Sequence, residues 1–299
     1  MLDVLIIGSG PAGLAAAVYA KRANLKVLVA EKIYCGTGQI AESNLVDNYL
    51  GFSGINGYEL GEKFREHAIS LGVEFKEGEA VRFEQEEGIW HVTFANGDAQ
   101  ESKTVIYAAG AEHRHLDIAG EKEFSGKGVS YCATCDGAFF RNKVCAVIGG
   151  GDTALDDALY LSDISSKVYL VHRRDAFRGS AKTVEKLKQK DNVEFVLSAV
   201  PSQITGTEKV QTLQLADGRS LDVDGVFIAA GMIPMTGKLQ GVAELDAGGY
   251  VVADETGKTS AAGFFAAGDV RTKALRQVIT AVSDGANAAT SAEHYIRQQ

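Results

Sequence analysis

The chain of 299 residues is long enough for one large domain or two medium-sized domains, and its content of 45% hydrophobic and 23% charged residues is typical of globular proteins. Its net charge of -9 argues against nucleic acid or an anionic membrane as the main partner, because both bind basic surfaces. With 34 glycines and 3 prolines, the composition excludes a collagen-like chain and predicts glycines in turns and near ligands.

The N-terminal segment lacks the features of a targeting signal. Its apolar run, Leu2 to Ile7, is too short for the core of a signal peptide, and no basic residue precedes it. No run of about 18 apolar residues occurs, so no membrane-spanning helix is expected. Four cysteines do not make the disulfide framework of a secreted domain. These features predict a cytoplasmic protein with reduced thiols.

The first 31 residues carry the pattern of a dinucleotide-binding unit. An apolar strand over residues 2–7 leads into three glycines at G-x-G-x-x-G spacing: Gly8, Gly10 and Gly13. An alanine-rich helix follows, and then a second apolar strand over residues 27–30 that ends at Glu31. An acid about 20 residues after the first glycine can bind a ribose hydroxyl, and the glycines allow close approach of a pyrophosphate. Together, the two strands, the glycines, the helix and Glu31 predict a nucleotide site.

The same pattern recurs in the second half of the chain. An apolar strand over residues 144–148 precedes Gly149-Gly150-Gly151-Asp152-Thr153-Ala154, an amphipathic helix and a strand over residues 167–171. His172 stands at the position of the acid and is followed by three arginines: Arg173, Arg174 and Arg178. The second motif thus has arginines where the first motif has an acid, and arginines favour a ribose that carries a 2′-phosphate. This site is therefore expected to prefer NADP to NAD. Alternatively, these arginines belong to a basic turn that only faces solvent.

Repeated segments predict how the two domains are connected. Hairpin patterns with Asn96-Gly97 and Asp217-Gly218 at their turns each lead to an apolar strand. Three strands end in Ala-Ala-Gly, at residues 108–110, 229–231 and 266–268. The third has no nucleotide motif of its own, which indicates that the second domain interrupts the first. The predicted fold is α/β, with two Rossmann-like three-layer nucleotide-binding domains, residues 1–115 with 245–299 and the inserted residues 116–244.

The second domain also carries a C-x-x-C pair, Cys132 and Cys135, followed directly by Asp136. A zinc site needs four ligands, and no histidine lies at finger spacing, so no metal is expected. Two structural thiols remain possible, but beside two nucleotide motifs a redox pair is favoured. Asp136 can then transfer protons, or it can be a turn or helix-capping acid.

The remaining two cysteines have different surroundings. Cys145 lies in an apolar strand and is expected to be a small buried hydrophobe. Cys35 follows the first motif in a glycine-containing loop, and the sequence leaves its role open.

At this point the sequence resembles a family, the low-molecular-weight, bacterial-type thioredoxin reductases of the class II pyridine nucleotide-disulfide oxidoreductases. The motifs that carry the resemblance span the chain: GSGPAG, DNYLG, CATCDG, GGGDTALDDALYLS, HRRDAFR and GFFAAGDV. The resemblance implies a homodimer with FAD on the first domain, NADPH on the second and thioredoxin as protein substrate. It further implies that Cys135 is the flavin-proximal thiol, Cys132 the interchange thiol and Asp136 the acid–base group.

The resemblance also implies two sets of cofactor-binding residues. The FAD set comprises Gly8, Gly10, Pro11, Ala12, Gly13, Glu31, Gly38, Gln39, Asn48, Gly110, Asp269, Arg276 and Gln277. The NADPH set comprises Gly149, Gly151, Asp152, Thr153, Arg173, Arg174 and Arg178. Asp269 is expected to meet the ribityl chain of FAD.

Three positions depart from the usual family pattern: Thr37, Leu50 and Met235. They lie near the expected flavin pocket or the domain junction, so they motivate the first of the two alternatives that stay open. One is the same fold and cysteine pair with reduced ferredoxin as donor or another dithiol/disulfide as acceptor. The other is an FAD-binding redox sensor without turnover.

Overall fold

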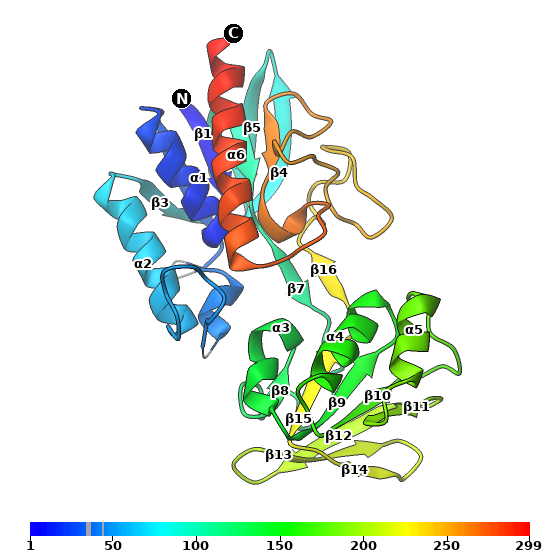
Figure 1. The fold of residues 1–299 in the computed structure, drawn as a ribbon. Coiled ribbons are helices and arrows are strands. Elements are labelled where there is room, and N and C mark those ends of the chain that lie inside the picture. The colour runs from blue at the N-terminus through cyan, green and yellow to red at the C-terminus, as the bar shows by residue number, and fades with distance from the viewer. Residues whose placement is uncertain (34–36, 44) are drawn as a thin grey trace. The chain divides into compact units, whose positions relative to one another are not determined.

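The computed structural model describes residues 1–33, 37–43 and 45–299, and Cys35 therefore lies outside the described residues. The chain divides into two compact units, with the second inserted in the first (Figure 1). Unit 1 contains Met1–Glu112 and Ile233–Gln299, and unit 2 contains His113–Met232. Each unit has a parallel sheet with helices packed on it, so the predicted α/β fold with two Rossmann-like units is confirmed.

Unit 1 is built on a seven-stranded sheet. Its strands are β1 (Leu2–Ile7), β2 (Val27–Glu31), β3 (Glu74–Glu77), β4 (Ala80–Glu86), β5 (Ile89–Phe94), β6 (Ala99–Tyr107) and β17 (Phe264–Ala266). They follow the order β3-β2-β1-β6-β5-β4, with β17 also paired to β6. Strands β3, β2, β1, β6 and β17 pair in parallel, whereas β4 and β5 form an antiparallel edge. The predicted hairpin around Asn96-Gly97 joins β5 to β6.

The alternation of side chains in the strands of unit 1 creates two cores. On one face the sheet packs against α1 (Pro11–Arg22), α2 (Gly57–Ser70) and α6 (Val278–Arg297). Alanines make α1 and α6 a closely packed pair, because small side chains let two helices approach. On the other face Phe83, Trp90 and Phe264 form an aromatic cluster, and Leu239 and Val251 cover it. The first glycine turn therefore lies at the end of a strand that is buried on both faces.

Unit 2 repeats this architecture with a five-stranded sheet in the order β11-β10-β9-β15-β8. These strands are β8 (Val129–Ser130), β9 (Val144–Gly149), β10 (Lys167–Val171), β11 (Val193–Val196) and β15 (Gly225–Ala229). Every pair in the sheet is parallel. One face packs against α4 (Asp152–Ser162) and α5 (Ala181–Lys188). The other face carries the antiparallel strands β12 (Pro201–Gly206), β13 (Val210–Leu215) and β14 (Ser220–Asp222), which include the second predicted hairpin.

The chain passes between the units in two short strands, β7 (Ala111–His113) and β16 (Met232–Pro234), which pair with each other. The units divide after Glu112 and after Met232, whereas the sequence placed the domain boundaries after residues 115 and 244. The second difference has a clear physical cause. Leu239 and Val242 pack in the core of unit 1, which the sequence pattern alone did not reveal.

Candidate redox and nucleotide sites

The first glycine turn joins β1 to α1 in unit 1 and contains Gly8, Gly10 and Gly13. Gly8 has a φ of +104°, in the left-handed region that favours glycine. A Cβ built on Gly13 would stand 1.9 Å from the Gly8 carbonyl oxygen, so no side chain fits there. Gly10 precedes α1 as its N-cap, and Pro11 and Ala12 begin the helix. The turn thus exposes backbone N–H groups at a helix N-terminus, the arrangement that binds pyrophosphate.

Glu31 is tied to this turn from the end of β2. Its Oε2 accepts hydrogen bonds from the Ser9 backbone N–H at 2.7 Å and from the Ser9 hydroxyl at 2.9 Å. Its Oε1 accepts from the Lys32 backbone N–H at 2.7 Å. The carboxylate therefore fixes the glycine turn and lies where the second strand of a dinucleotide site ends. Ser9 was not among the predicted site residues.

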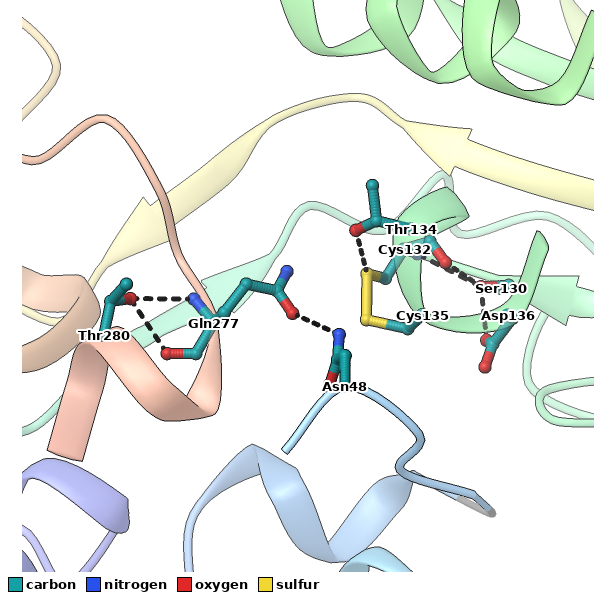
Figure 2. Close-up of a disulfide and its surroundings, with 8 residues drawn as sticks. All are labelled: Asn48, Ser130, Cys132, Thr134, Cys135, Asp136, Gln277 and Thr280. Atoms are coloured by element: carbon teal, nitrogen blue, oxygen red, sulfur yellow. Dashed lines mark hydrogen bonds between the residues drawn. A yellow bond between two sulfur atoms is a disulfide. The ribbon is translucent and has the colours of Figure 1, made fainter. Parts of the chain in front are cut away.

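Other residues predicted to bind FAD are brought into pairs within unit 1. Gly38 approaches the turn, since a Cβ on Gly10 would lie 3.7 Å from the Gly38 Cα. The Gln39 amide donates to the carbonyl of Ala111, the residue after Gly110. Figure 2 shows the amide of Asn48 donating to Gln277 Oε1 at 2.9 Å. Gln277 in turn caps α6 in a reciprocal capping box with Thr280.

The buried polar atoms in unit 1 that have no hydrogen-bond partner among the described residues include Asp269 Oδ1, Arg276 Nε and Thr37 Oγ1. Burial raises the pKa of Asp269, although Lys273 and Arg276 act in the opposite direction. The guanidinium of Arg276 lies 4.1 Å from the ring centroid of Tyr250. Buried polar groups are normally satisfied, so these atoms fit a bound polar ligand such as FAD.

An unpredicted buried ion cluster supports the turn that carries Asp269. Asp284, on α6, accepts from Arg271 Nη2 at 2.7 Å and Nε at 2.9 Å, and from Lys273 Nζ at 2.8 Å. It also accepts from the backbone N–H of Gly268 at 3.0 Å. The three charged side chains are each at most 7% exposed. Asp284 therefore anchors the residue next to Asp269 and keeps two cations at this end of the sheet.

The second glycine turn joins β9 to α4 in unit 2. A Cβ on Gly149 would lie 2.5 Å from the Ala229 carbonyl oxygen, whereas a Cβ on Gly151 would meet no atom within 4 Å. Asp152 Oδ1 accepts from the Ser180 backbone N–H at 2.6 Å, and the Arg178 N–H donates to the Gly150 carbonyl at 2.8 Å. These contacts fold the arginine-containing loop against the glycine turn. Thr153 is exposed in the first turn of α4.

His172 and the arginines have different roles in this loop. His172 is 6% exposed and stacks on Phe177 with ring centroids 5.3 Å apart. Burial lowers its pKa, and Arg174, Arg178 and Arg173 lower it further. All three arginine side chains are exposed. The buried His172 ring thus belongs to the same loop as three exposed arginines, whose guanidinium groups can meet an anionic group such as the predicted 2′-phosphate.

Cys132 and Cys135 form a disulfide with a Cα–Cα distance of 5.3 Å. Cys132 directly precedes the short helix α3 (Ala133–Asp136), and η2 (Gly137–Phe140) follows. The Ser130 hydroxyl donates to Asp136 Oδ2 at 2.6 Å, and the Cys132 N–H donates to Ser130 Oγ at 3.1 Å (Figure 2). Burial raises the pKa of Asp136, and the bond from Ser130 opposes that rise. The disulfide and a carboxyl that can carry a proton thus share one segment.

The structure also describes Cys145 and the three positions that depart from the family pattern. Cys145 is fully buried, as predicted, and burial raises its pKa to about 11. Thr37 is buried, whereas Leu50 is 92% exposed. Met235 contributes through its backbone, accepting from the Tyr107 hydroxyl at 2.6 Å and donating to the Gly110 carbonyl at 3.0 Å. The difference from the family pattern at Met235 therefore leaves these two backbone hydrogen bonds in place.

Two kinds of feature are absent from residues 1–33, 37–43 and 45–299. Within this part of the chain, none of the helices combines the length and apolarity that crossing a bilayer requires. The same part contains no group of three or more His, Cys, Asp or Glu side chains arranged to hold a metal ion.

Ser9, Ser130 and Asp284 are the polar residues of these sites that sequence reasoning missed. Ser9 lies inside the glycine motif and Ser130 two residues before the C-x-x-C, so their positions were available signals. Asp284 lies in the middle of a long helix, where an acid ordinarily faces solvent, and its burial follows only from packing.

Comparisons with known proteins identify the family. The pattern of the pyridine nucleotide-disulphide oxidoreductases matches residues 2–285. The chain is 44% identical over 300 residues to thioredoxin reductase of Treponema pallidum, covering 98% of this chain and 97% of that protein. It is 40% identical to the Bacillus subtilis thioredoxin reductase, with coverage of 99% and 95%. The crystal structure of thioredoxin reductase from Streptococcus pyogenes aligns with a TM-score of 0.94 at 40% identity, covering 100% of this chain and 99% of that one.

These matches extend over both units and include both glycine turns and the cysteine pair. They agree with the disulfide between Cys132 and Cys135, the unpartnered polar atoms of unit 1 and the arginine loop of unit 2. The chain belongs to the pyridine nucleotide-disulphide oxidoreductases and, within them, to the thioredoxin reductases, enzymes that use FAD and NADPH to reduce a protein disulfide.

Proposed function

We propose that Cys132 and Cys135 are the redox pair of this enzyme, with thioredoxin as substrate and Asp136 as the acid–base group. The observation that carries this proposal is the disulfide between the two cysteines beside the hydrogen-bonded pair Ser130 and Asp136. We further propose that the enzyme is a homodimer and acts in the cytoplasm, as the family resemblance implies.

Unit 1 (Met1–Glu112 and Ile233–Gln299), for which the sequence predicted residues 1–115 and 245–299, is the proposed FAD-binding domain. The proposed ligands are Gly8, Gly10, Pro11, Ala12, Gly13, Glu31, Gly38, Gln39, Asn48, Gly110, Asp269, Arg276 and Gln277. The unpartnered buried atoms of Asp269 and Arg276 support this set, because a bound polar group would satisfy them. When bound, FAD and NADPH supply the two electrons that reduce the disulfide.

Unit 2 (His113–Met232), for which the sequence predicted residues 116–244, is the proposed NADPH-binding domain. The proposed ligands are Gly149, Gly151, Asp152, Thr153, Arg173, Arg174 and Arg178. The glycine turn at the N-terminus of α4 would hold the pyrophosphate, and the exposed arginines would pair with the 2′-phosphate. These arginines favour a nicotinamide donor over reduced ferredoxin.

The proposed disulfide exchange uses the reduced pair in two steps. The Cys132 thiolate attacks a thioredoxin sulfur, so a mixed disulfide forms while the thioredoxin disulfide breaks. The sulfur that leaves takes a proton, for which the raised pKa of Asp136 makes its carboxyl a suitable source. The Cys135 thiolate then attacks Cys132 Sγ, which restores the enzyme disulfide and releases thioredoxin with two thiols.

The test is an anaerobic assay of the FAD-loaded enzyme with NADPH and oxidised thioredoxin. We expect flavin bleaching by NADPH, followed by NADPH consumption when thioredoxin is added. A Cys135→Ser variant should retain FAD but lose disulfide reduction, and retained turnover would remove the pair from the mechanism. FAD binding with negligible turnover on any disulfide would instead favour the redox-sensor alternative. Sedimentation of the FAD-loaded enzyme tests the homodimer.

A further inference from the structure

A second polar cluster, centred on the buried carboxylate of Glu121, contacts the Cys132 segment through Tyr131. Glu121 is 1% exposed, and its Oε1 accepts from the Tyr131 hydroxyl at 2.8 Å. Tyr131 is the residue immediately before Cys132. None of the motifs that identify the family function accounts for this hydrogen bond.

Glu121 is itself held by the backbone. The Leu116 N–H donates to Oε1 at 3.1 Å and to Oε2 at 3.0 Å, and the Ile118 N–H donates to Oε2 at 3.4 Å. Burial alone would raise the pKa of Glu121, but the bonds from Tyr131, Leu116, His115 and Ile118 outweigh it and hold this pKa below its ordinary value. Glu121 is therefore an ionised, fixed acceptor whose own carboxylate is shielded from water.

Two histidines hold the ring of Tyr131. His113 stacks on it with centroids 5.0 Å apart and an interplanar angle of 23°, and His115 meets it edge-on at 5.4 Å. His115 Nδ1 lies 2.9 Å from the Tyr131 hydroxyl oxygen and 3.2 Å from Glu121 Oε1. The tyrosine hydroxyl donates to Glu121 while its oxygen can accept from His115. The side chain is thus fixed at its ring and at its hydroxyl.

The side chains of two consecutive residues, Ser130 and Tyr131, link this cluster to the redox segment. Strand β8 ends at Ser130, whose hydroxyl reaches Asp136 and accepts the Cys132 N–H (Figure 2). The next side chain, Tyr131, reaches Glu121. The two residues before Cys132 are therefore each held by a carboxylate, one within the redox helix and one outside it.

We propose that Glu121, acting through Tyr131, is a positioning residue that holds the Cys132 thiol next to Cys135. Reduction of the disulfide removes the covalent link between the two sulfurs. Backbone and side-chain contacts alone then determine how far Cys132 can move. Holding the preceding residue raises the effective concentration of one thiol at the other and favours re-formation of the disulfide.

This inference rests on the proposed role of the cysteine pair, and its test is a redox equilibrium that needs neither NADPH nor thioredoxin. The FAD-loaded enzyme is equilibrated anaerobically with mixtures of glutathione and glutathione disulfide, and the free thiols are quantified by alkylation and mass spectrometry. In this reaction the Cys132–Cys135 bond forms, the bond of glutathione disulfide breaks, and two glutathione thiols take up the two protons and two electrons.

The variants are Tyr131→Phe, which removes only the hydroxyl, and Glu121→Gln, which removes the charge at constant shape. Each should lower the equilibrium constant for the enzyme disulfide by about tenfold, which corresponds to about 30 mV in a two-electron couple. The matched control is Tyr19→Phe, a half-exposed residue on α1 of unit 1, which should leave the constant unchanged. Circular dichroism and bound FAD establish that each variant is folded.

An unchanged constant in folded Tyr131→Phe and Glu121→Gln would overturn the inference, and so would an equal shift in the Tyr19→Phe control. Failure of the wild-type enzyme to reduce thioredoxin would instead count against the proposed function. The two failures are distinguishable because the equilibrium is measured on the thiols themselves.

Discussion

Ser130 and Asp136 are joined by a hydrogen bond of 2.6 Å that spans the cysteine pair, with Ser130 before Cys132 and Asp136 after Cys135. The bond stabilises the ionised carboxylate, while burial favours the protonated form more strongly and raises the Asp136 pKa. A carboxyl balanced in this way can carry a proton at higher pH than an ordinary aspartate can. Such a carboxyl can supply the proton that a leaving sulfur takes up in thiol–disulfide exchange.

Replacing Asp136→Asn is expected to lower disulfide turnover by about 100-fold or more, the usual contribution of a positioned acid–base group. Because folding raises this pKa, the buried carboxyl favours the folded state at acid pH, and that contribution is lost as the pH rises through the folded-state value. The asparagine variant should therefore be at least as stable as wild type at pH 7, and its stability should depend less on pH.

Turnover with thioredoxin and thermal unfolding between pH 4 and 8 provide the measurements for Asp136→Asn. The exposed Asp191→Asn is the charge-matched control and should change neither property. Normal turnover in Asp136→Asn would exclude the acid–base role.

Replacing the three exposed arginines Arg173, Arg174 and Arg178 singly by glutamine should raise KM for NADPH by about 10-fold or more, since charged hydrogen bonds contribute about 1.5–3 kcal/mol. KM for NADH should change little, because NADH lacks the 2′-phosphate. The comparison of the two donors in steady-state kinetics is the measurement. Lys209→Gln, in the turn between β12 and β13, removes the same charge from unit 2 as a control. An equal change for both donors would argue against 2′-phosphate recognition.

Replacing Asp284→Asn should lower the free energy of unfolding by about 3–5 kcal/mol, because it leaves the buried cations Arg271 and Lys273 without their anion. Weaker FAD binding should accompany the loss, since Asp284 also holds Gly268, the neighbour of Asp269. Urea unfolding and FAD titration of the apoprotein measure the two effects. Glu255→Gln, an exposed acid in unit 1, is the control. Wild-type stability in Asp284→Asn would contradict the importance of this cluster.

Replacing Gly13→Ala should destabilise unit 1 by about 1–3 kcal/mol or more and reduce FAD content, because the new Cβ would collide with the Gly8 carbonyl. Gly237→Ala is a matched control, since its Cβ would meet no atom within 4 Å. Thermal unfolding and the flavin absorbance of the purified proteins provide the measurement. Equal behaviour of the two variants would show that the turn tolerates a side chain.

Several parts of the fold could be predicted because they depend on residues close together in sequence. The strand ending at Ile7, the glycine turn and the following helix are one continuous segment. The hairpin at Asn96-Gly97 is equally local. In these segments the periodicity of apolar residues and the steric freedom of glycine act over a few residues, so the pattern alone specifies the structure.

The second connection between the units could not be predicted from local sequence patterns. Residues 233–244 carry no strong helix or strand pattern, and the sequence placed them with the inserted domain. Leu239 and Val242 nevertheless pack against the aromatic face of unit 1. Their burial depends on strands far away in the chain, which a local pattern does not report.

The sequence by itself determined the family, the two nucleotide motifs and the Cys132–Cys135 pair, because the chemistry of each is written in neighbouring residues. Only the tertiary structure decided which buried polar groups support them. Asp284 reaches Arg271 from within α6, and Glu121 reaches Tyr131 from the turn region before β8. Whether an acid is solvated or buried against a partner depends on how distant segments pack, since a buried charge is stable only where the fold supplies its counterpart.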